Sequence, residues 1–282
     1  MPGDLRSVLR VAVVMLGALF AVGQLTGIVP LGGDSYAYWL ADPLHPYVRS
    51  TVGNGYAYLY SPAFAQAIEP LRLVPWPVFA AVWTMILAVA LAWTAGPWGI
   101  LLVLLPPVLA SIALGNIEIL MATAIVAGFR YPAAWAFVVL TKVTPGVGLV
   151  WFAVRREWRS LAVALGATAA ITAIYFAIAP AAWFEWADSL RRNAGVIFPL
   201  WTLPGPLWLR VVLAAAIVAW GGRTDRRWTV PVAAAIAMPV PYWTFLALLA
   251  VGVVGLLDRA PGRGTIVIAG NRSRVDRLRG RV

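Results

Sequence analysis

An acidic residue, Asp34, follows shortly after the first apolar run of the chain. A carboxylate just beyond the end of a spanning segment can lie at the rim of a membrane cavity, where it can take a proton from a hydroxyl group. The alternative is that Asp34 caps a short interfacial helix over residues 36–40, a position that Asp favours. Asp34 is therefore either a general base with a chemical role or a helix cap with a structural role.

Two basic residues lie inside apolar segments. Lys142 is the single lysine, since 21 of the 22 basic residues are arginine. An ionisable side chain at membrane depth is costly and therefore suggests a function. If Arg210 faces Lys142, the pair could hold a phosphate, with the arginine fork binding two oxygens. A structural ion pair for Lys142, or snorkelling of either side chain to the surface, is the alternative.

Asn116 and Glu118 follow a glycine between two apolar runs. Asn can cap a helix, and Glu suits a first helical turn, so ordinary helix-start chemistry would explain both. Within the membrane, Glu118 could instead pair with Lys142 or Arg210. We take Asn116 and Glu118 as candidate substrate-binding residues.

Aromatic residues and one histidine lie in the same outer stretch as the acid. Tyr36, Tyr58 and Tyr60 have ring faces that suit a sugar, although Tyr is also common at the membrane interface. His45 is the only histidine, so a His-rich metal site cannot form. Coordination of a metal by loop carboxylates stays open, but no cofactor is expected. We include the three tyrosines and His45 among the candidate substrate-binding residues.

The composition indicates a membrane protein. Of the 282 residues, 62% are hydrophobic and 12% charged, and the mean hydropathy is +0.83. The net charge of +11 does not indicate nucleic acid, because the basic residues lie between apolar runs and not on one solvated face. The absence of cysteine excludes disulfides and thiol chemistry.

The apolar pattern predicts an all-α polytopic membrane protein with about 8 to 10 transmembrane segments, several of them short or broken. Residues 1–27 could be a signal peptide, because Arg6 and Arg10 precede an apolar run, but an uncleaved first span is favoured because that run is about 20 residues long. The apolar segments fall at about 8–28, 76–95, 98–114, 117–130, 132–142, 145–155, 161–179, 205–221, 228–239 and 241–257.

Arginine placement predicts the orientation, because basic residues are retained on the cytoplasmic side. With both termini cytoplasmic, every basic cluster lies inside only if 132–155 crosses twice and reverses at 142–145. Each arm would be about 17 Å long, too short for a core of about 30 Å, so a break is implied. Broken backbone at that depth must line protein or a cavity, which indicates a site. The rival topology makes 61–75 a span and 132–155 one helix.

This topology gives one transmembrane domain over 1–257. Its first extracytoplasmic loop, 29–75, should carry interfacial helices, and a second outer loop runs over 180–204. Residues 258–282 contain seven arginines and read as a basic cytoplasmic tail near anionic headgroups. The expected location is the plasma (inner) membrane, with the active site on the extracytoplasmic side.

Taken in order, these motifs resemble the GT-C fold membrane glycosyltransferases, in particular glycosyltransferase family 87 (GT87), which uses polyprenol-phosphate-mannose. Asp34 resembles the first-loop acid of that family, and Arg210 the arginine after its second outer loop. The other matching motifs are the aromatic-proline stretch 58–62, the small-polar pair 115–116 and the Lys-x-x-Pro break 142–145. The resemblance covers roughly residues 8–257.

The resemblance implies a GT-C-like bundle that moves a sugar from a polyprenyl-phosphate donor to a hydroxyl of a glycolipid or glycan acceptor. The sugar that this family usually transfers is mannose. Asp34 would act as the base in an inverting attack, and Lys142 and Arg210 would stabilise the departing phosphate. Two other classes stay open: a transporter or lipid flippase, in which broken helices also mark substrate sites, and a non-catalytic subunit of the same fold.

Overall fold

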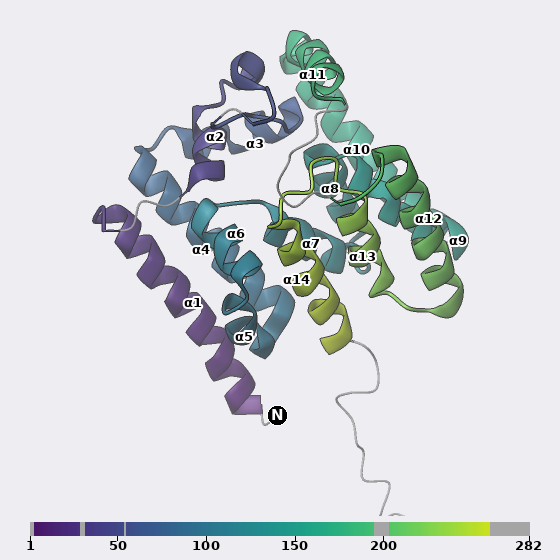
Figure 1. The fold of residues 1–282 in the computed structure, drawn as a ribbon, viewed down its shortest axis with the longest axis horizontal. Helices are drawn as coiled ribbons and strands as arrows, with labels where there is room; N and C mark the ends of the chain where they lie inside the picture. The colour runs from purple at the N-terminus through teal and green to yellow at the C-terminus, as the bar shows by residue number, and fades with distance from the viewer. Residues whose placement is uncertain (1–2, 29–31, 54, 195–202, 260–282) are drawn as a thin grey trace, which may run out of the picture.

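The computed structural model describes residues 3–28, 32–53, 55–194 and 203–259, and within these ranges all regular structure is helical (Figure 1). The α-helices are α1 (Gly3–Leu25), α2 (Gly33–Leu40), α3 (Pro62–Arg72), α4 (Trp76–Ala95), α5 (Gly99–Val103), α6 (Pro106–Leu114), α7 (Glu118–Gly128), α8 (Trp135–Thr141), α9 (Val150–Val154), α10 (Trp158–Ile178), α11 (Pro180–Asn193), α12 (Leu207–Thr224), α13 (Thr229–Ile236) and α14 (Phe245–Asp258). The 3-10 helices are η1 (Pro46–Arg49), η2 (Gly96–Trp98), η3 (Pro132–Ala134) and η4 (Thr144–Leu149).

Among the described residues, four helices are long and apolar enough to cross a membrane: Asp4–Leu25, Trp76–Val103, Trp158–Ile178 and Leu207–Thr224. The pair α6 and α7 would make a fifth span, bent by 107° at its break. Three further apolar helices have 10–17 residues, namely Pro132–Thr141, Thr144–Val154 and Phe245–Asp258, and α13 has only eight, in agreement with the prediction of short and broken segments. The all-α polytopic class is confirmed, and a count of eight to ten holds only if the short helices are included.

The segment 132–155 doubles back at Lys142. The backbone of Lys142 is extended (φ −140°, ψ 110°), which ends α8. Pro145 has no N–H to continue a helical bond to Thr141, so the next turns form separately. The start of α8 then meets the returning arm, because the rings of Trp135 and Phe152 lie 6.4 Å apart. The rival interpretation of one continuous helix is therefore wrong, and α3, at 11 residues and about 16 Å, is too short to span.

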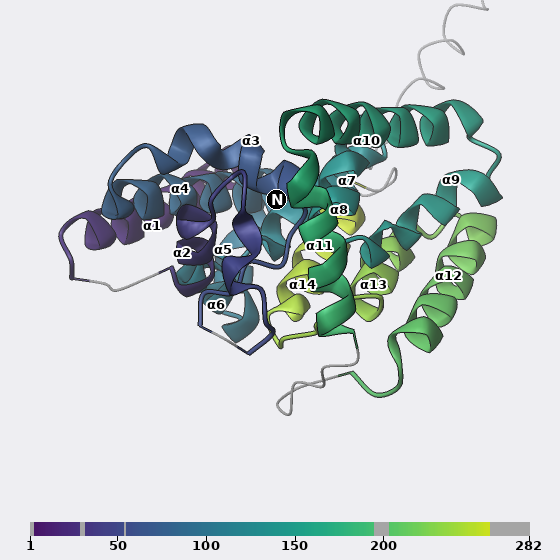
Figure 2. The same cartoon turned by 90° about the horizontal axis from the view of Figure 1, so that it is seen from above.

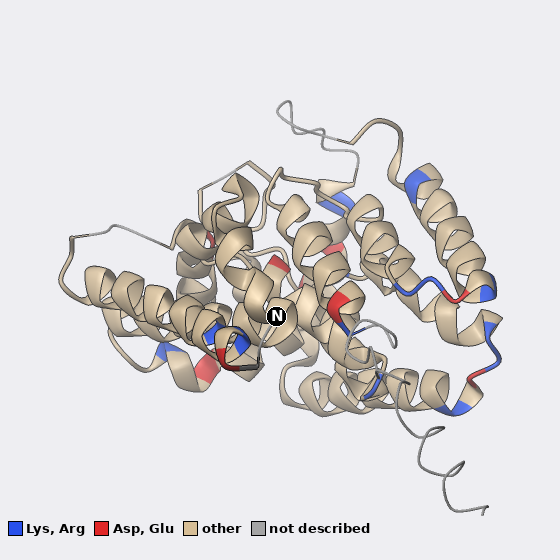
Figure 3. Ribbon diagram, turned by 90° about the horizontal axis from the view of Figure 1, so that it is seen from below, with Lys and Arg blue, Asp and Glu red and all other residues tan. Residues whose placement is uncertain are grey.

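Basic residues gather at one end of the bundle. Arg6, in the first turns of α1, lies 3.9 Å from Asp258 at the end of α14. Arg155, after α9, forms a 2.9 Å ion pair with Asp225, after α12. Figure 3 shows blue segments at the helix ends seen from below. The helix ends that positive-inside reasoning assigns to the cytoplasm thus share one side of the molecule.

The opposite end carries α2, α3 and α11, which lie side by side in Figures 1 and 2. The helix α11 holds the outer loop through Asn193, whose Nδ2 donates to the Ser50 carbonyl at 2.6 Å. Asn193 Oδ1 also accepts from the Val52 N–H at 2.8 Å. The loop over 29–75 therefore does contain short helices. Residues 195–202 of the second outer loop and 260–282 of the tail lie outside the described residues.

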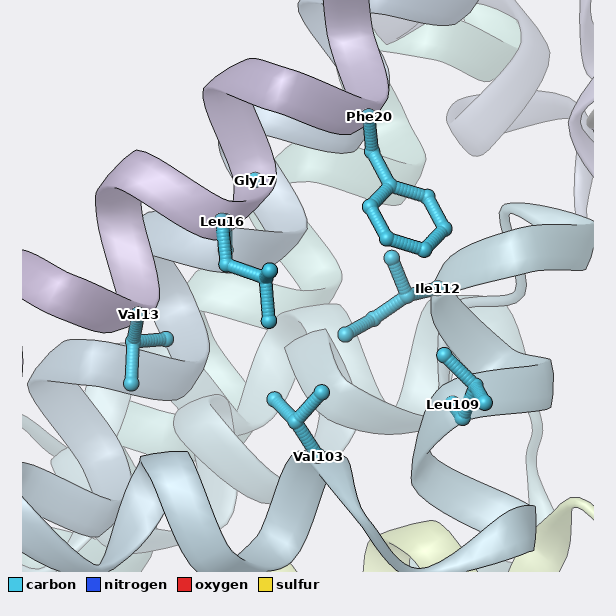
Figure 4. Close-up of a pocket in the computed structure, with 8 residues that line it drawn as sticks. Val13, Leu16, Gly17, Phe20, Val103, Leu109 and Ile112 are labelled. Atoms are coloured by element: carbon cyan, nitrogen blue, oxygen red, sulfur yellow. The ribbon is translucent and has the colours of Figure 1, made fainter. Parts of the chain in front are cut away.

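Close packing fixes α1 on the rest of the bundle. Gly17 faces Ala88 of α4 so closely that a Cβ added at Gly17 would lie 2.3 Å from that of Ala88. Small residues allow membrane helices to approach in this way. The apolar cavity between α1, α4, α5 and α6 (Figure 4) has a volume of only about 10 Å³, barely that of one water. The interface is thus tightly packed and apolar.

Candidate functional site

The first turn of α2 docks on the junction between α6 and α7. The Gly32 N–H donates to the Ala113 carbonyl at 2.8 Å, and the Trp83 indole N–H donates to the Gly115 carbonyl at 2.8 Å. These bonds use backbone groups that the ends of short helices leave unpaired. The Gly32 bond holds the start of α2, and with it Asp34, against the α6–α7 break, and the Trp83 bond ties α4 to the same break.

Gly115 is required at that break for two reasons. Its φ of +71° lies in the left-handed region, where a Cβ is strained. A Cβ there would also come within 2.3 Å of Ser35 Oγ on α2. The glycine of the small-polar motif thus lets α2 approach closely enough for the next residue, Asn116, to reach the acid.

Asp34 and Asn116 are in direct contact. Asn116 Nδ2 donates to Asp34 Oδ2 at 2.6 Å, across 82 residues of sequence. Burial, and secondarily the charge of Glu118, raises the pKa of Asp34 from 3.8 to about 6, against the opposing effects of Lys142 and the Asn116 hydrogen bond. The carboxylate is mostly ionised at neutral pH, yet it is a stronger base than an ordinary aspartate, as general-base catalysis needs.

Glu118 and Lys142 form an ion pair beside this contact. Lys142 Nζ lies 3.1 Å from Glu118 Oε1, and the two side chains are 15% and 3% exposed. This was one of the pairings that the sequence left open. Glu118 Oε2 and Asn116 Oδ1 are buried, and neither has a hydrogen-bond partner among the described residues. Since an ammonium group has three donors, the single bond to Glu118 leaves Lys142 able to bind an anion.

Arg210 is buried near the same region but is held by other groups. Its Nη1 donates to the Met238 carbonyl at 2.7 Å and to the Ile236 carbonyl at 3.2 Å. The described contacts therefore join Arg210 to the end of α13, and none of them joins it to Lys142. Arg210 Nε is buried, and no hydrogen-bond partner for it occurs in the described part of the chain.

The linker between α13 and α14, residues 237–244, connects these motifs. Thr144, two residues after Lys142, donates its hydroxyl to the Ala237 carbonyl. Asn116 Nδ2 has a second, longer contact of 3.4 Å with Thr244 Oγ1. With the Arg210 bond to Met238, three of the predicted motifs reach this one linker. Sequence reasoning missed it, although the prolines at 239 and 241 between two apolar runs signal a break.

Tyr58 and Tyr60 are buried inside the outer loop, with 1% and 9% of their surface exposed. Tyr58 donates to the Ser61 carbonyl at 2.8 Å, and the hydroxyls of Tyr60 and Tyr38 lie 3.0 Å apart. The rings of Tyr58 and Tyr60 also pack on each other, with centroids 5.6 Å apart. The structure gives these two candidates a clear packing role in the support of α2.

Tyr36 and His45 lie elsewhere in the outer loop. Tyr36 is partly exposed and packs edge-on against Tyr56 and Trp76, with centroids 4.8 Å away in each case. His45 is exposed, and its Nδ1 lies 2.8 Å from Glu185 Oε1 on α11. The bond to Glu185 raises the pKa of His45. The structure therefore places His45 in a loop-to-α11 contact and not among the contacts of Asp34.

The site thus consists of a polar cluster where α2 meets the break between α6 and α7 and the reversal at Lys142. It offers one carboxylate base, one ammonium group and a buried guanidinium. Among the described residues, no group of three or more His, Cys, Asp or Glu side chains could hold a metal ion. Such a cluster can deprotonate a hydroxyl and bind an anion.

Comparison with known proteins gives one family. The model of glycosyltransferase family 87 matches residues 58–267, about three quarters of the chain. No curated protein and no solved structure matches significantly. The matched range includes Asn116, Glu118, Lys142 and Arg210, whereas Asp34 precedes it and is tied to the family region by its bond to Asn116. The chain is a membrane glycosyltransferase that belongs to glycosyltransferase family 87.

Proposed function

We propose that the protein transfers a sugar from a polyprenyl-phosphate donor to a hydroxyl of a cell-envelope glycolipid or polysaccharide. The family resemblance suggests that this sugar is mannose. The observation that carries this proposal is the convergence of Asp34, Asn116, Glu118 and Lys142 from three separate parts of the chain. A base beside a cation suits a reaction in which one hydroxyl loses a proton and one phosphate departs.

In the proposed reaction, Asp34 takes the proton of the acceptor hydroxyl as its oxygen attacks the anomeric carbon. The bond from that carbon to the phosphate oxygen breaks on the opposite face, so the configuration inverts. The electron pair leaves with the polyprenyl phosphate. The reaction uses no cofactor, and the pKa of about 6 leaves Asp34 ionised and ready as a base at neutral pH.

Lys142 would bind the donor phosphate and stabilise the charge that builds up on it in the transition state. Its partner Glu118 keeps the ammonium group in place before the donor arrives. Arg210 would contribute its charge from the α13 end, where its buried Nε has no partner within the described ranges and could donate to the phosphate. The linker 237–244 would set the distance between the two cations through its bonds to Thr144 and Arg210.

The proposed location is the plasma (inner) membrane, with both termini cytoplasmic and the site facing outward. The arginine-rich helix ends support this orientation, because they share the end of the bundle opposite α2 and α11. The prenyl tail of the donor would then lie in the bilayer, and the acceptor would come from the envelope side.

The test is sugar transfer by the purified protein in lipid, with polyprenyl-phosphate-mannose as donor and an extract of native membranes as acceptor. Asp34→Asn should reduce transfer by about 10²–10⁴-fold, the range for loss of a general base. Asp42→Asn is the matched control: it removes the same charge from the same loop, where Asp42 Oδ1 accepts the backbone N–H groups of Leu44 at 2.8 Å and His45 at 3.3 Å. Equal activity of wild type and Asp34→Asn, or no transfer by folded wild type with several donors, would reject the proposal in favour of a scaffold or transporter.

A further inference from the structure

A second candidate site lies at the arginine-rich end of the molecule. A cleft of about 470 Å³ runs between α1 and α4, near the end of α14 and far from α2 (Figure 1). Its volume falls in the range of small-molecule sites. The lining residues are Arg10, Val11, Val14, Met15, Val89, Ala92, Trp93 and Arg259.

Arg259 is a fixed charge in the wall of this cleft. Its guanidinium donates to the carbonyls of Trp93 and Thr94 at the end of α4, and to that of Gly255 at 2.9 Å. It also lies 4.5 Å from the ring centroid of Trp93. A cation at a helix C-terminus is favourable, so Arg259 has a structural reason for its position. Because Arg259 also lines the cleft, its positive charge lies next to any molecule that binds there.

Arg10 of α1 is the second charge in the wall of the cleft. It is exposed, and no hydrogen bond or ion pair to it occurs among the described residues. The acid nearby, Asp258, has Arg6 at 3.9 Å, and both Arg10 and Asp258 lie over Gly96. The local balance of Arg6, Arg10 and Arg259 against Asp258 is positive.

The rest of the cleft is apolar and open toward the side of the bundle. Val11 and Met15 of α1 are 59% and 58% exposed, and Val89 of α4 is 51% exposed. Farther along the same face of α1, Leu19 and Val22 are also exposed. An exposed apolar face of α1 therefore continues from the cleft, away from the two arginines.

We propose that this cleft binds an anionic phospholipid of the leaflet at the arginine-rich end. Arg10 would bind the phosphate in a bidentate manner, next to the charge of Arg259, and an acyl chain would lie against Val11, Met15 and Val89. A free phosphate would use the guanidinium groups but would leave these apolar walls exposed. This site is separate from the sugar-transfer site and does not depend on it.

The test uses the full-length protein in detergent, titrated with phosphatidylglycerol or phosphatidylcholine of the same chain length and followed by native mass spectrometry. Phosphatidylglycerol should bind with a defined stoichiometry of one at low lipid concentration and at least about tenfold more tightly than phosphatidylcholine. Arg10→Gln should weaken phosphatidylglycerol binding by about tenfold or more, with thermal stability measured on the same samples to exclude misfolding.

Two variants keep the test specific. Arg223→Gln removes the same charge from an exposed position at the end of α12 and should leave lipid binding unchanged. Val89→Trp fills the cleft without a change of charge and should reduce the binding of both lipids. Equal losses in Arg10→Gln and Arg223→Gln would overturn the proposal in favour of general surface charge. Full competition by inorganic phosphate would overturn it in favour of a simple anion site.

Discussion

The side-chain amide of Asn116 lies 2.6 Å from the carboxylate of Asp34, and this contact joins the outer loop to the break between α6 and α7. One partner belongs to the first turn of α2 and the other to the junction between two apolar helices. Their contact sets both the position and the proton affinity of the acid. The strength of that hydrogen bond should therefore be visible in the pH dependence of the enzyme.

With a pKa of about 6, Asp34 loses its proton as the pH rises from 5 to 7, so kcat/KM should rise over that range and level off above it. Asn116→Ala removes a hydrogen bond that lowers the pKa, so the rising limb should move to higher pH. The measurement is a transfer profile from pH 5 to 9. Thr244→Val, which removes only the 3.4 Å contact of Asn116, should leave the limb in place. An unmoved limb in Asn116→Ala would show that Asp34 does not control it.

Asp34→Asn should make the protein more stable while it abolishes transfer. The pKa is higher in the folded state than its ordinary value of 3.8, so the folded state binds the proton more tightly. The associated loss of stability therefore grows as the pH rises through 4 to 6 and reaches about 3 kcal/mol at neutral pH. An uncharged Asn should recover part of it, seen as a higher Tm in detergent at pH 7.5. A lower Tm than that of wild type would contradict this account of the site.

Removal of the Lys142 charge should destabilise the folded protein, because Glu118 loses its ion-pair partner. Lys142→Met leaves a buried carboxylate without its partner, a change that typically destabilises by about 3–5 kcal/mol. The double variant Lys142→Met with Glu118→Gln should regain most of that stability but not the transfer activity. The measurements are Tm and KM for the donor. If the double variant transfers sugar normally, Lys142 has no part in binding the phosphate.

Gly115→Ala should displace α2 and the acid on it. The φ of +71° and the 2.3 Å approach to Ser35 leave no room for a methyl group, so we expect a loss of about 1–3 kcal/mol and a larger loss of activity. Gly166→Ala is the matched control, because a Cβ at this position within α10 meets nothing within 4 Å. It should stabilise the helix by about 0.5–1 kcal/mol and leave transfer intact. Equal effects of the two substitutions on Tm would count against the close-approach argument.

The fold was largely predictable because membrane helices follow directly from apolar runs and their breaks. The predicted segments 76–95 and 161–179 lie close to α4 and α10. The reversal at Lys142 followed from the need to keep the arginines on one side, which is a global constraint and does not depend on local propensity. The pairing of Lys142 with Glu118 was foreseen as one of several options, because a buried cation requires an anionic partner.

The less predictable features depend on contacts between distant residues. Nothing near His45 in the sequence indicates its partner Glu185, which lies 140 residues away. Tyr58 and Tyr60 alternate as surface aromatics would, yet they are buried because α2 and α3 cover them. The role of the linker 237–244 is invisible in sequence because its contacts to Thr144 and Arg210 use backbone carbonyls, which any residue could supply.

The bond of the Gly32 N–H to the Ala113 carbonyl attaches the acid-bearing helix at its first turn. Under the proposed function, the base Asp34 thus lies in the layer of the protein that faces water, while Lys142 lies at a helix break below that layer. The glycan end of the acceptor, which lies in water, and the donor, which lies in lipid, can then approach from different sides and meet only where the two layers touch. The donor lipid then stays in the bilayer, and the acceptor hydroxyl stays on the water side, while the sugar is transferred.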